Sequence, residues 1–241
     1  MMNQSWRDAW WLVKFEFNKT KWSFLLLTLV LVVLTMMFAT TLTDYQEDKV
    51  FIDLFFLGAV TMAPFMGRTK NFSLNRLYGD FWGSPYFNFL KQTPVSEKVL
   101  LRSRFLLFGC QSILLNFIIL TLFYAFSTLV RESYSLQTYL IFSILWMIVG
   151  LITSSSIAAA EFGSEMRMWK IVFYCIVFYG GLFTSAVLYY HYTEFGVLGG
   201  FFYLSEHAPL MALLIGIVLL IMNFVGWKIY SVKIMHTVNY L

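Results

Sequence analysis

Charged residues are scarce in this chain of 241 residues: Asp, Glu, Lys and Arg make up 12%, whereas hydrophobic residues make up 59%. Soluble domains carry about 25% charged residues, because a globule needs a polar surface facing water. With half of that charge the chain cannot cover itself against water, which excludes a soluble globular domain. The sequence predicts one integral membrane domain over residues 1–241.

Motifs that carry chemistry are missing as well. The sequence has no G-x-x-x-x-G-K-[ST] phosphate loop, no G-x-G-x-x-G after a strand and no H-E-x-x-H zinc motif. Its two cysteines, Cys110 and Cys175, both lie in apolar segments, which disfavours a disulfide framework. We therefore predict no catalytic residue, no metal site and no cofactor in this chain.

Long apolar segments are what the sequence has instead. A helix needs about 20 apolar residues to cross the hydrocarbon core of a bilayer. Six segments qualify, so the predicted fold class is an all-α membrane protein with six transmembrane helices. We place the spans at Ser23–Leu42, Val50–Met66, Phe105–Val130, Thr138–Ala160, Ile171–Tyr190 and Pro209–Ile229.

The distribution of basic residues predicts the orientation. Connections on alternate sides of the six spans hold 15 and 2 of the 17 Lys and Arg residues. Basic residues accumulate on the cytoplasmic side of membrane proteins. Both termini are therefore expected in the cytoplasm.

Residues 1–22, which precede the first span, form a separate pattern. Trp6, Trp10, Val13 and Phe17 recur at helical spacing, and basic residues fall largely on another face. An amphipathic helix of this kind lies in the headgroup layer. We predict an interfacial helix that anchors the first span or seats a cytoplasmic partner.

Two connections are longer than a helix hairpin requires. Residues 67–104 contain Pro85 and Pro94, which exclude one continuous helix. We expect two short cytoplasmic helices joined at a kink, the second with Pro94 in its first turn and Thr93 as its cap. Residues 191–208 are rich in glycine and aromatic residues and lack Lys and Arg. They suit an extracellular, partly re-entrant segment or an ordinary interfacial loop.

Few residues point to a pathway through the membrane. Asp53 is the one ionisable residue well inside the predicted spans, where such residues are often functional. The small residues of the fourth span suit helix packing or a polar path, and the aromatic residues of the fifth suit packing or a cleft for cargo. Glu161 is expected at a solvated helix end. The candidate pathway residues are Asp53, Ser154, Ser155, Phe178, Tyr179 and Phe183.

The chain resembles the membrane subunits of type 2 ABC exporters, a class that includes small bacterial peptide- and toxin-export permeases. The resemblance rests on the N-terminal amphipathic helix, the six spans, the aromatic segment before the last span, and the long second connection. Within that connection, Leu90, Pro94, Val95 and Ser96 match the pattern Leu-x-x-x-Pro-[Val/Ile]-Ser.

The resemblance implies that residues 86–97 form a coupling helix seated in a separate ABC ATP-binding subunit, which would bind ATP and Mg. It also implies a second permease copy, identical or paralogous, a bacterial cell membrane and no nucleic acid. The chain would then export a hydrophobic or amphipathic cargo, such as a peptide toxin, an antimicrobial peptide or a drug, without being an enzyme itself. The implied interface residues are Tyr86, Phe89, Leu90, Gln92, Pro94, Val95, Ser96 and Glu97.

Three other functions stay open on the residues alone. The chain has the span number of a substrate-binding membrane subunit of an importer, which also lacks a phosphate loop. An ion-coupled secondary carrier would depend on Asp53. An intramembrane enzyme would need facing acidic and histidine residues within the bilayer, and the sequence offers none at matching depth on several spans.

Overall fold

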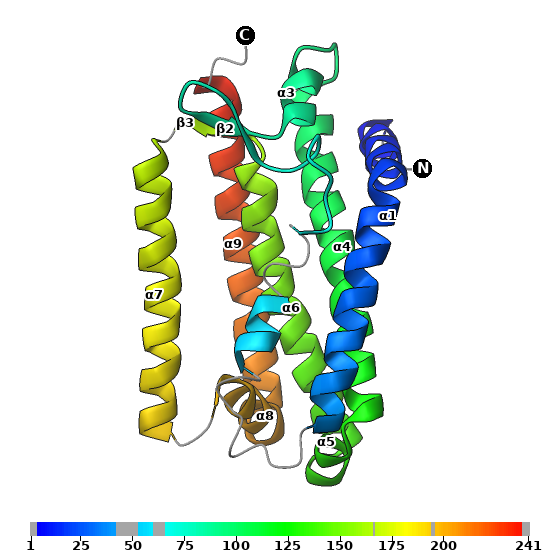
Figure 1. Ribbon diagram of the computed structural model, residues 1–241, viewed down its shortest axis with the longest axis vertical. Coiled ribbons are helices and arrows are strands. Elements are labelled where there is room, and N and C mark those ends of the chain that lie inside the picture. The colour runs from blue at the N-terminus through cyan, green and yellow to red at the C-terminus, as the bar shows by residue number, and fades with distance from the viewer. Residues whose placement is uncertain (1–3, 42–52, 60–65, 166, 194–195, 238–241) are drawn as a thin grey trace.

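The computed structural model describes residues 4–41, 53–59, 66–165, 167–193 and 196–237. It is mostly helical, at 83%. Figure 1 shows the long helices running roughly side by side along one axis, with α7 standing at the outside. The long helices are α1 (Gln4–Thr41), α4 (Glu97–Phe126), α6 (Leu136–Ala160), α7 (Met168–Thr193) and α9 (Pro209–Thr237).

Four of these helices, within the described residues, are long and apolar enough to cross a membrane: α1, α4, α6 and α9. Their outward side chains are large and apolar; Leu210 and Ile229 on α9, for example, are 80% and 65% exposed. Apolar surface of that extent is stable against lipid rather than water. The helices therefore indicate a multi-pass membrane protein.

The expectation of six spans is not met by the described residues. The predicted second span lies partly outside them, and what is described of it is a short helical segment at residues 53–59. The predicted fifth span falls within the 26-residue helix α7, which is not among the four. Prediction was accurate for α6 and for the start of α9, because both coincide with uninterrupted apolar runs bounded by polar residues or proline.

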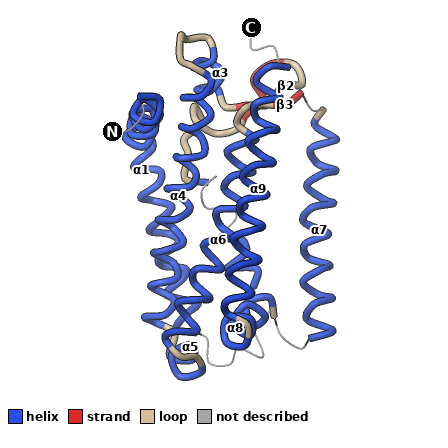
Figure 2. Tube along the Cα trace, turned by 180° about the vertical axis from the view of Figure 1, so that it is seen from behind, coloured by secondary structure: helices blue, strands red, loops and turns tan. Residues whose placement is uncertain are grey.

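The two ends of the bundle differ in what they carry. Figures 1 and 2 show both chain termini at one end, together with the short helix α3 (Pro85–Lys91) and the strands, and α5 (Thr128–Ser133) and α8 (Val197–His207) at the other. The termini and the long second connection thus share one end, the one that the basic residues predict to be cytoplasmic. We refer to it as the basic end.

The N-terminal segment is not a separate helix. We expected a break between residues 1–22 and the first span, but α1 runs without interruption from Gln4 to Thr41. In both views its first turns are seen nearly end-on, so this part of α1 runs at a steep angle to the rest. Trp6 and Trp10 stay exposed as expected, whereas Ala9 and Leu12 are buried against the protein.

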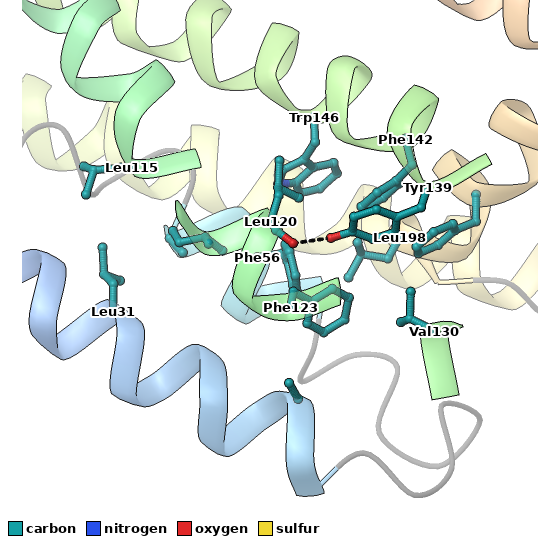
Figure 3. Close-up of a cluster of buried hydrophobic side chains, with 14 of the residues drawn as sticks. Leu31, Phe56, Leu115, Leu120, Phe123, Val130, Tyr139, Phe142, Trp146 and Leu198 are labelled. Atoms are coloured by element: carbon teal, nitrogen blue, oxygen red, sulfur yellow. Dashed lines mark hydrogen bonds between the residues drawn. The ribbon is translucent and has the colours of Figure 1, made fainter. Parts of the chain in front are cut away.

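An aromatic core fills the half of the bundle far from the basic end. Phe56, Phe142 and Trp146 are fully buried there, and Phe142 stacks on Phe202 of α8 at a centroid distance of 4.0 Å. Figure 3 shows Phe142 and Trp146 of α6 gathered with Phe56 of the segment at 53–59 and Phe123 of α4. The hydroxyl of Tyr139 donates a 2.6 Å hydrogen bond to a carbonyl oxygen of α4, which ties α6 to α4.

A small antiparallel sheet at the basic end was not predicted. Its strands are β1 (Asn75–Tyr78), β2 (Phe81–Gly83) and β3 (Ser164–Glu165), in the order β1-β2-β3. Gly79, with φ +49°, makes the tight turn between β1 and β2. Gly163, with φ +91°, leads into β3, and a Cβ there would lie 2.4 Å from the Phe81 ring. The sheet thus joins the second connection to the end of α6.

Candidate functional site

Four charged side chains meet inside the basic end of the bundle and form a closed ring of alternating sign. Arg68 contacts the carboxylates of Glu16 and Glu161. Arg104 reaches the same two carboxylates: its Nη2 lies 2.6 Å from Glu16 Oε2, and its Nη1 lies 3.1 Å from Glu161 Oε2. We call Glu16, Arg68, Arg104 and Glu161 the ionic ring. Each cation thus bridges both anions, and the ring has no net charge.

Water has little access to the ionic ring. The side chains of Glu16 and Arg104 are fully buried, and those of Arg68 and Glu161 are 2% and 3% exposed. Phe108 lies under the Arg68 guanidinium at 4.8 Å and Tyr86 under that of Arg104 at 5.6 Å. Burial, and then the nearby charge of Arg104, lower the pKa of Arg68 below its usual value. An isolated charge in such a place is costly, so the four side chains depend on one another.

The ionic ring connects four parts of the chain that are distant in sequence. Glu16 comes from α1, Arg68 from the segment after the predicted second span, Arg104 from α4 and Glu161 from the end of α6. A change in the position of any of these parts would break at least two charge contacts. Such a ring keeps the parts in one arrangement, or makes them move together.

Sequence reasoning missed the ionic ring. Glu161 was predicted to be solvated, and this was wrong: it is 2% exposed, because α6 ends inside the protein against Arg68 and Arg104. Glu16 was not singled out. The signal in the sequence was a carboxylate close to the first apolar run, in a basic, Trp-rich helix whose one other acidic residue is Asp8. Acidic side chains are rarely buried unless they are paired.

Helix α3 sits beside the ring, on a second apolar core at the basic end. Ser84 caps α3 by accepting a hydrogen bond from the Phe87 N–H at 3.4 Å, and Pro85 occupies the first turn. Phe87 and Leu90 are buried, and Phe87 packs edge-on against Phe162 at 4.8 Å. This inner face attaches α3 to α4 and to the end of α6.

The residues predicted for a partner interface divide into two groups. Phe89, which is 61% exposed, Gln92, Pro94 and Ser96 face outward, where a partner can reach them. Tyr86 and Val95 are partly buried and pack against the core of the basic end, as Leu90 does. Glu97 is engaged within the chain, since it pairs with Lys91 and lies 3.4 Å from His236. The outward group is called the α3 rim below.

The predicted start of the second short helix was wrong. Pro94 and Thr93 do not begin a helix; α4 starts at Glu97, with Ser96 as its N-cap residue, and continues into the membrane-length helix. The Thr93 hydroxyl instead donates to the Leu90 carbonyl oxygen at 2.6 Å and closes the end of α3. Only residues 92–96 therefore separate α3 from the 30-residue helix α4. A movement of α3 would reach α4 through this short connection.

Asp53 has a structural role that its sequence position did not reveal. It is 6% exposed, and its two carboxylate oxygens accept hydrogen bonds from the N–H groups of Val197 at 2.5 Å and Leu198 at 2.9 Å. These N–H groups open α8, so Asp53 caps that helix from a distant part of the chain. A carboxylate held in this way is poorly placed to bind a transported ion.

The other predicted pathway residues are not gathered with Asp53. Ser154 and Ser155 line a cavity of about 330 Å³ between α4, α6 and α9. Phe178, Tyr179 and Phe183 belong to α7, and their side chains lie outside the described residues. Among the described residues, no three His, Cys, Asp or Glu side chains are grouped so as to hold a metal ion.

Buried polar residues on α4 were also overlooked. Gln111, Ser112 and Asn116 are each at most 1% exposed, and Ser112 and Asn116 lie against Gly150 of α6. Asn116 Nδ2 donates to the Ser112 carbonyl oxygen at 2.9 Å, directly against Gly150, where a Cβ would lie 2.4 Å from it. Polar side chains inside an apolar span were the available signal.

No family model, curated protein or solved structure matches this chain.

Proposed function

We propose that this chain is the membrane subunit of an ATP-driven exporter and that the α3 rim docks into a separate ABC ATP-binding subunit. ATP and Mg would be bound by that subunit, because the chain has no phosphate loop. The observation that carries the proposal is the placement of α3: its outer edge is exposed and its inner face is fixed beside a buried ionic ring that connects α1, α4 and α6.

The arrangement supports a transmission role for α3. A partner that pushes on Phe89 or Pro94 acts on a short helix that is anchored by Phe87 and Leu90 and continues within a few residues into α4. Arg104 on α4 then carries the displacement to Glu16 on α1 and Glu161 on α6. ATP binding would favour one arrangement of these helices only if the partner holds α3 differently in its two states.

Two permease copies and two ATP-binding subunits would make the complete transporter, as the resemblance implies. The cargo would be hydrophobic or amphipathic and leave from the cytoplasm or the inner leaflet. Sparse charge on the membrane helices supports that class of cargo over a free sugar.

The test starts with the tagged chain, purified in mild detergent from its native host and analysed for copurifying proteins by mass spectrometry. The expected result is a stoichiometric subunit that carries a G-x-x-x-x-G-K-[ST] motif and hydrolyses ATP. Replacing two residues of the rim, Phe89→Ala with Pro94→Ala, should remove that subunit while the chain stays folded and monodisperse.

The matched control is Trp169→Ala. Trp169 is also 61% exposed, but it lies at the start of α7, away from α3. The Trp169→Ala variant should keep its ATP-binding subunit. A chain that purifies without any ATPase under conditions that preserve other ABC complexes would contradict the proposal, and so would an ATPase that binds equally well to the rim variant.

A further inference from the structure

A second cavity at the basic end combines an apolar lining with three positive charges. It has a volume of about 510 Å³ and lies between the first turns of α1, the start of α4 and the last turns of α9. Its charged lining residues are Lys98, Arg102 and Lys228, and none of the described residues that line it is acidic. The rest of the lining is apolar or aromatic: Trp6, Leu101, Phe105, Leu106, Phe224 and Val232.

The three cations differ in how they are held. The Arg102 guanidinium contacts the Ser5 hydroxyl and lies 4.5 Å over the Trp6 ring, so it is oriented from the first turn of α1. Lys98 and Lys228 are exposed, and among the described residues neither forms an ion pair. Positive charge is therefore concentrated at the cavity without a neutralising partner from the described chain.

The cavity adjoins the mostly apolar 330 Å³ cavity toward the middle of the bundle. Phe105 and Phe224 line both this cavity and the 330 Å³ cavity that holds Ser154 and Ser155, and their rings meet at 5.0 Å. The 330 Å³ cavity lies deeper along the same two helices, and apart from Ser154 and Ser155 its lining is apolar. The two adjoining cavities follow α4 and α9 and are together called the α4/α9 groove; its basic residues lie at the outer end, its mouth.

The groove has the length of one lipid leaflet. Lys98 marks its mouth and Gly109 its inner part, 11 positions later on α4. At about 1.5 Å per residue this is about 16 Å, close to half of the ~30 Å hydrocarbon core. Basic pockets between membrane helices on the cytoplasmic side are suited to anionic lipid headgroups.

We infer that the α4/α9 groove binds one anionic phospholipid, with its phosphate at Lys98, Arg102 and Lys228 and one acyl chain along Phe105, Phe224 and the deeper cavity. A soluble phosphate compound would use the mouth but leave the apolar groove empty, whereas a neutral lipid would leave the three charges unpaired. The inference rests on the groove and on membrane insertion and is independent of the exporter proposal.

The test is native mass spectrometry of the delipidated chain, titrated with phosphatidylglycerol or with phosphatidylcholine of the same acyl chains. The expected result is selective binding of one phosphatidylglycerol. Lys98→Ala with Lys228→Ala should weaken that binding on the order of 25-fold, at about fivefold for each cation near the headgroup. Binding of phosphatidylcholine should be unchanged.

Further variants distinguish a lipid in this groove from non-specific attraction and from a soluble ligand. Lys170→Ala with Lys233→Ala removes two basic residues of the same end that do not line the cavity, and it should change the affinity less than twofold. Val225→Trp fills the deeper cavity from an exposed position and should weaken phosphatidylglycerol binding with all three cations in place. Gly109→Leu fills the same cavity from the other helix and should have the same effect.

Three results would overturn the inference. Equal affinity for the two lipids would remove the role of charge, and an equal loss in the Lys170/Lys233 variant would make the attraction non-specific. Displacement of phosphatidylglycerol by excess inorganic phosphate, with no effect of Val225→Trp, would assign the mouth to a soluble phosphate compound.

Discussion

The carboxylate of Asp53 holds the first turn of α8: its Oδ1 accepts a 2.9 Å hydrogen bond from the N–H of Leu198, 145 positions later in the chain. The aromatic core lies directly behind this contact, because Leu198 and Phe202 of α8 pack into it. One buried acid therefore secures the end of the bundle opposite α3.

Replacement of Asp53 distinguishes a helix cap from a transport acid. Asp53→Ala leaves the N–H groups of Val197 and Leu198 without their acceptor, at a cost of about 1–3 kcal/mol for the buried Leu198 N–H alone. Asp53→Asn keeps one of the two acceptor oxygens and places an amide NH2 group at the other, so it preserves one of the two hydrogen bonds. We therefore expect the thermal midpoint in detergent to fall for both variants, and to fall less for the Asn variant than for the Ala variant. Loss of transport in a stable Asn variant would instead indicate that Asp53 titrates during function.

The ionic ring predicts strong coupling between its members. Arg68→Met leaves two buried carboxylates facing only Arg104 and should destabilise the protein by about 3–5 kcal/mol. Adding Glu16→Leu removes one charge of the opposite sign, so the double variant should be more stable than Arg68→Met alone. Thermal unfolding of the single variants and the double variant measures this coupling.

The exposed pair Arg76–Asp80 serves as the control for the ring. Their side chains are 55% and 48% exposed at a distance of 3.3 Å. Arg76→Met should lower the free energy of unfolding by less than about 1 kcal/mol, because water screens an exposed ion pair. If the destabilisations of Arg68→Met and Glu16→Leu simply add in the double variant, the two residues do not act as a unit.

Gly150 sets the approach of α6 to α4. Gly150→Ala would place a Cβ 2.4 Å from Asn116 Nδ2 and 2.9 Å from the Ser112 hydroxyl, so the hydrogen bonds of Asn116 would be lost. The unpaired buried amide should lower the free energy of unfolding by about 1–3 kcal/mol. Gly226→Ala on α9 meets nothing within 4 Å and should be tolerated. Thermal unfolding of the two variants gives the comparison, and equal midpoints would show that α4 and α6 do not depend on this contact.

Orientation is testable by labelling single cysteines in a chain whose Cys110 and Cys175 are replaced by Ala. The two positions for the introduced cysteine are Lys70, near α3, and Glu132, in α5, and both are exposed. A membrane-impermeant maleimide should label Glu132→Cys in intact cells, and Lys70→Cys only after the membrane is permeabilised. The reverse pattern would invert the predicted topology and place α3 outside the cell.

The same method decides whether α7 crosses the membrane. Arg167 immediately precedes α7, and His191 lies in its last turn. A spanning α7 should make His191→Cys accessible from outside and Arg167→Cys accessible only from inside. Labelling of both from one side would show that α7 lies along the membrane or beside it.

Sequence reasoning succeeded where the relevant physics is local. The apolar run at Thr138–Ala160 predicted α6 within two residues, because its length and composition suffice to identify a helix suited to lipid. It failed at residues 75–83, where β1 and β2 form a short hairpin and β3 from the distant end of α6 pairs with it. It also placed a helix start at Pro94, although the chain needs those residues to connect α3 with α4.

Composition and the order of apolar and basic residues determined by themselves that the chain belongs in a membrane and which end is predicted to face the cytoplasm. These properties are sums along the chain and need no knowledge of contacts. Only the tertiary structure decided that Glu16 meets Arg104, that Glu161 is buried and that Asp53 caps α8. The rotation of each helix about its axis selects which side chains meet, and that rotation is set by packing against the other helices.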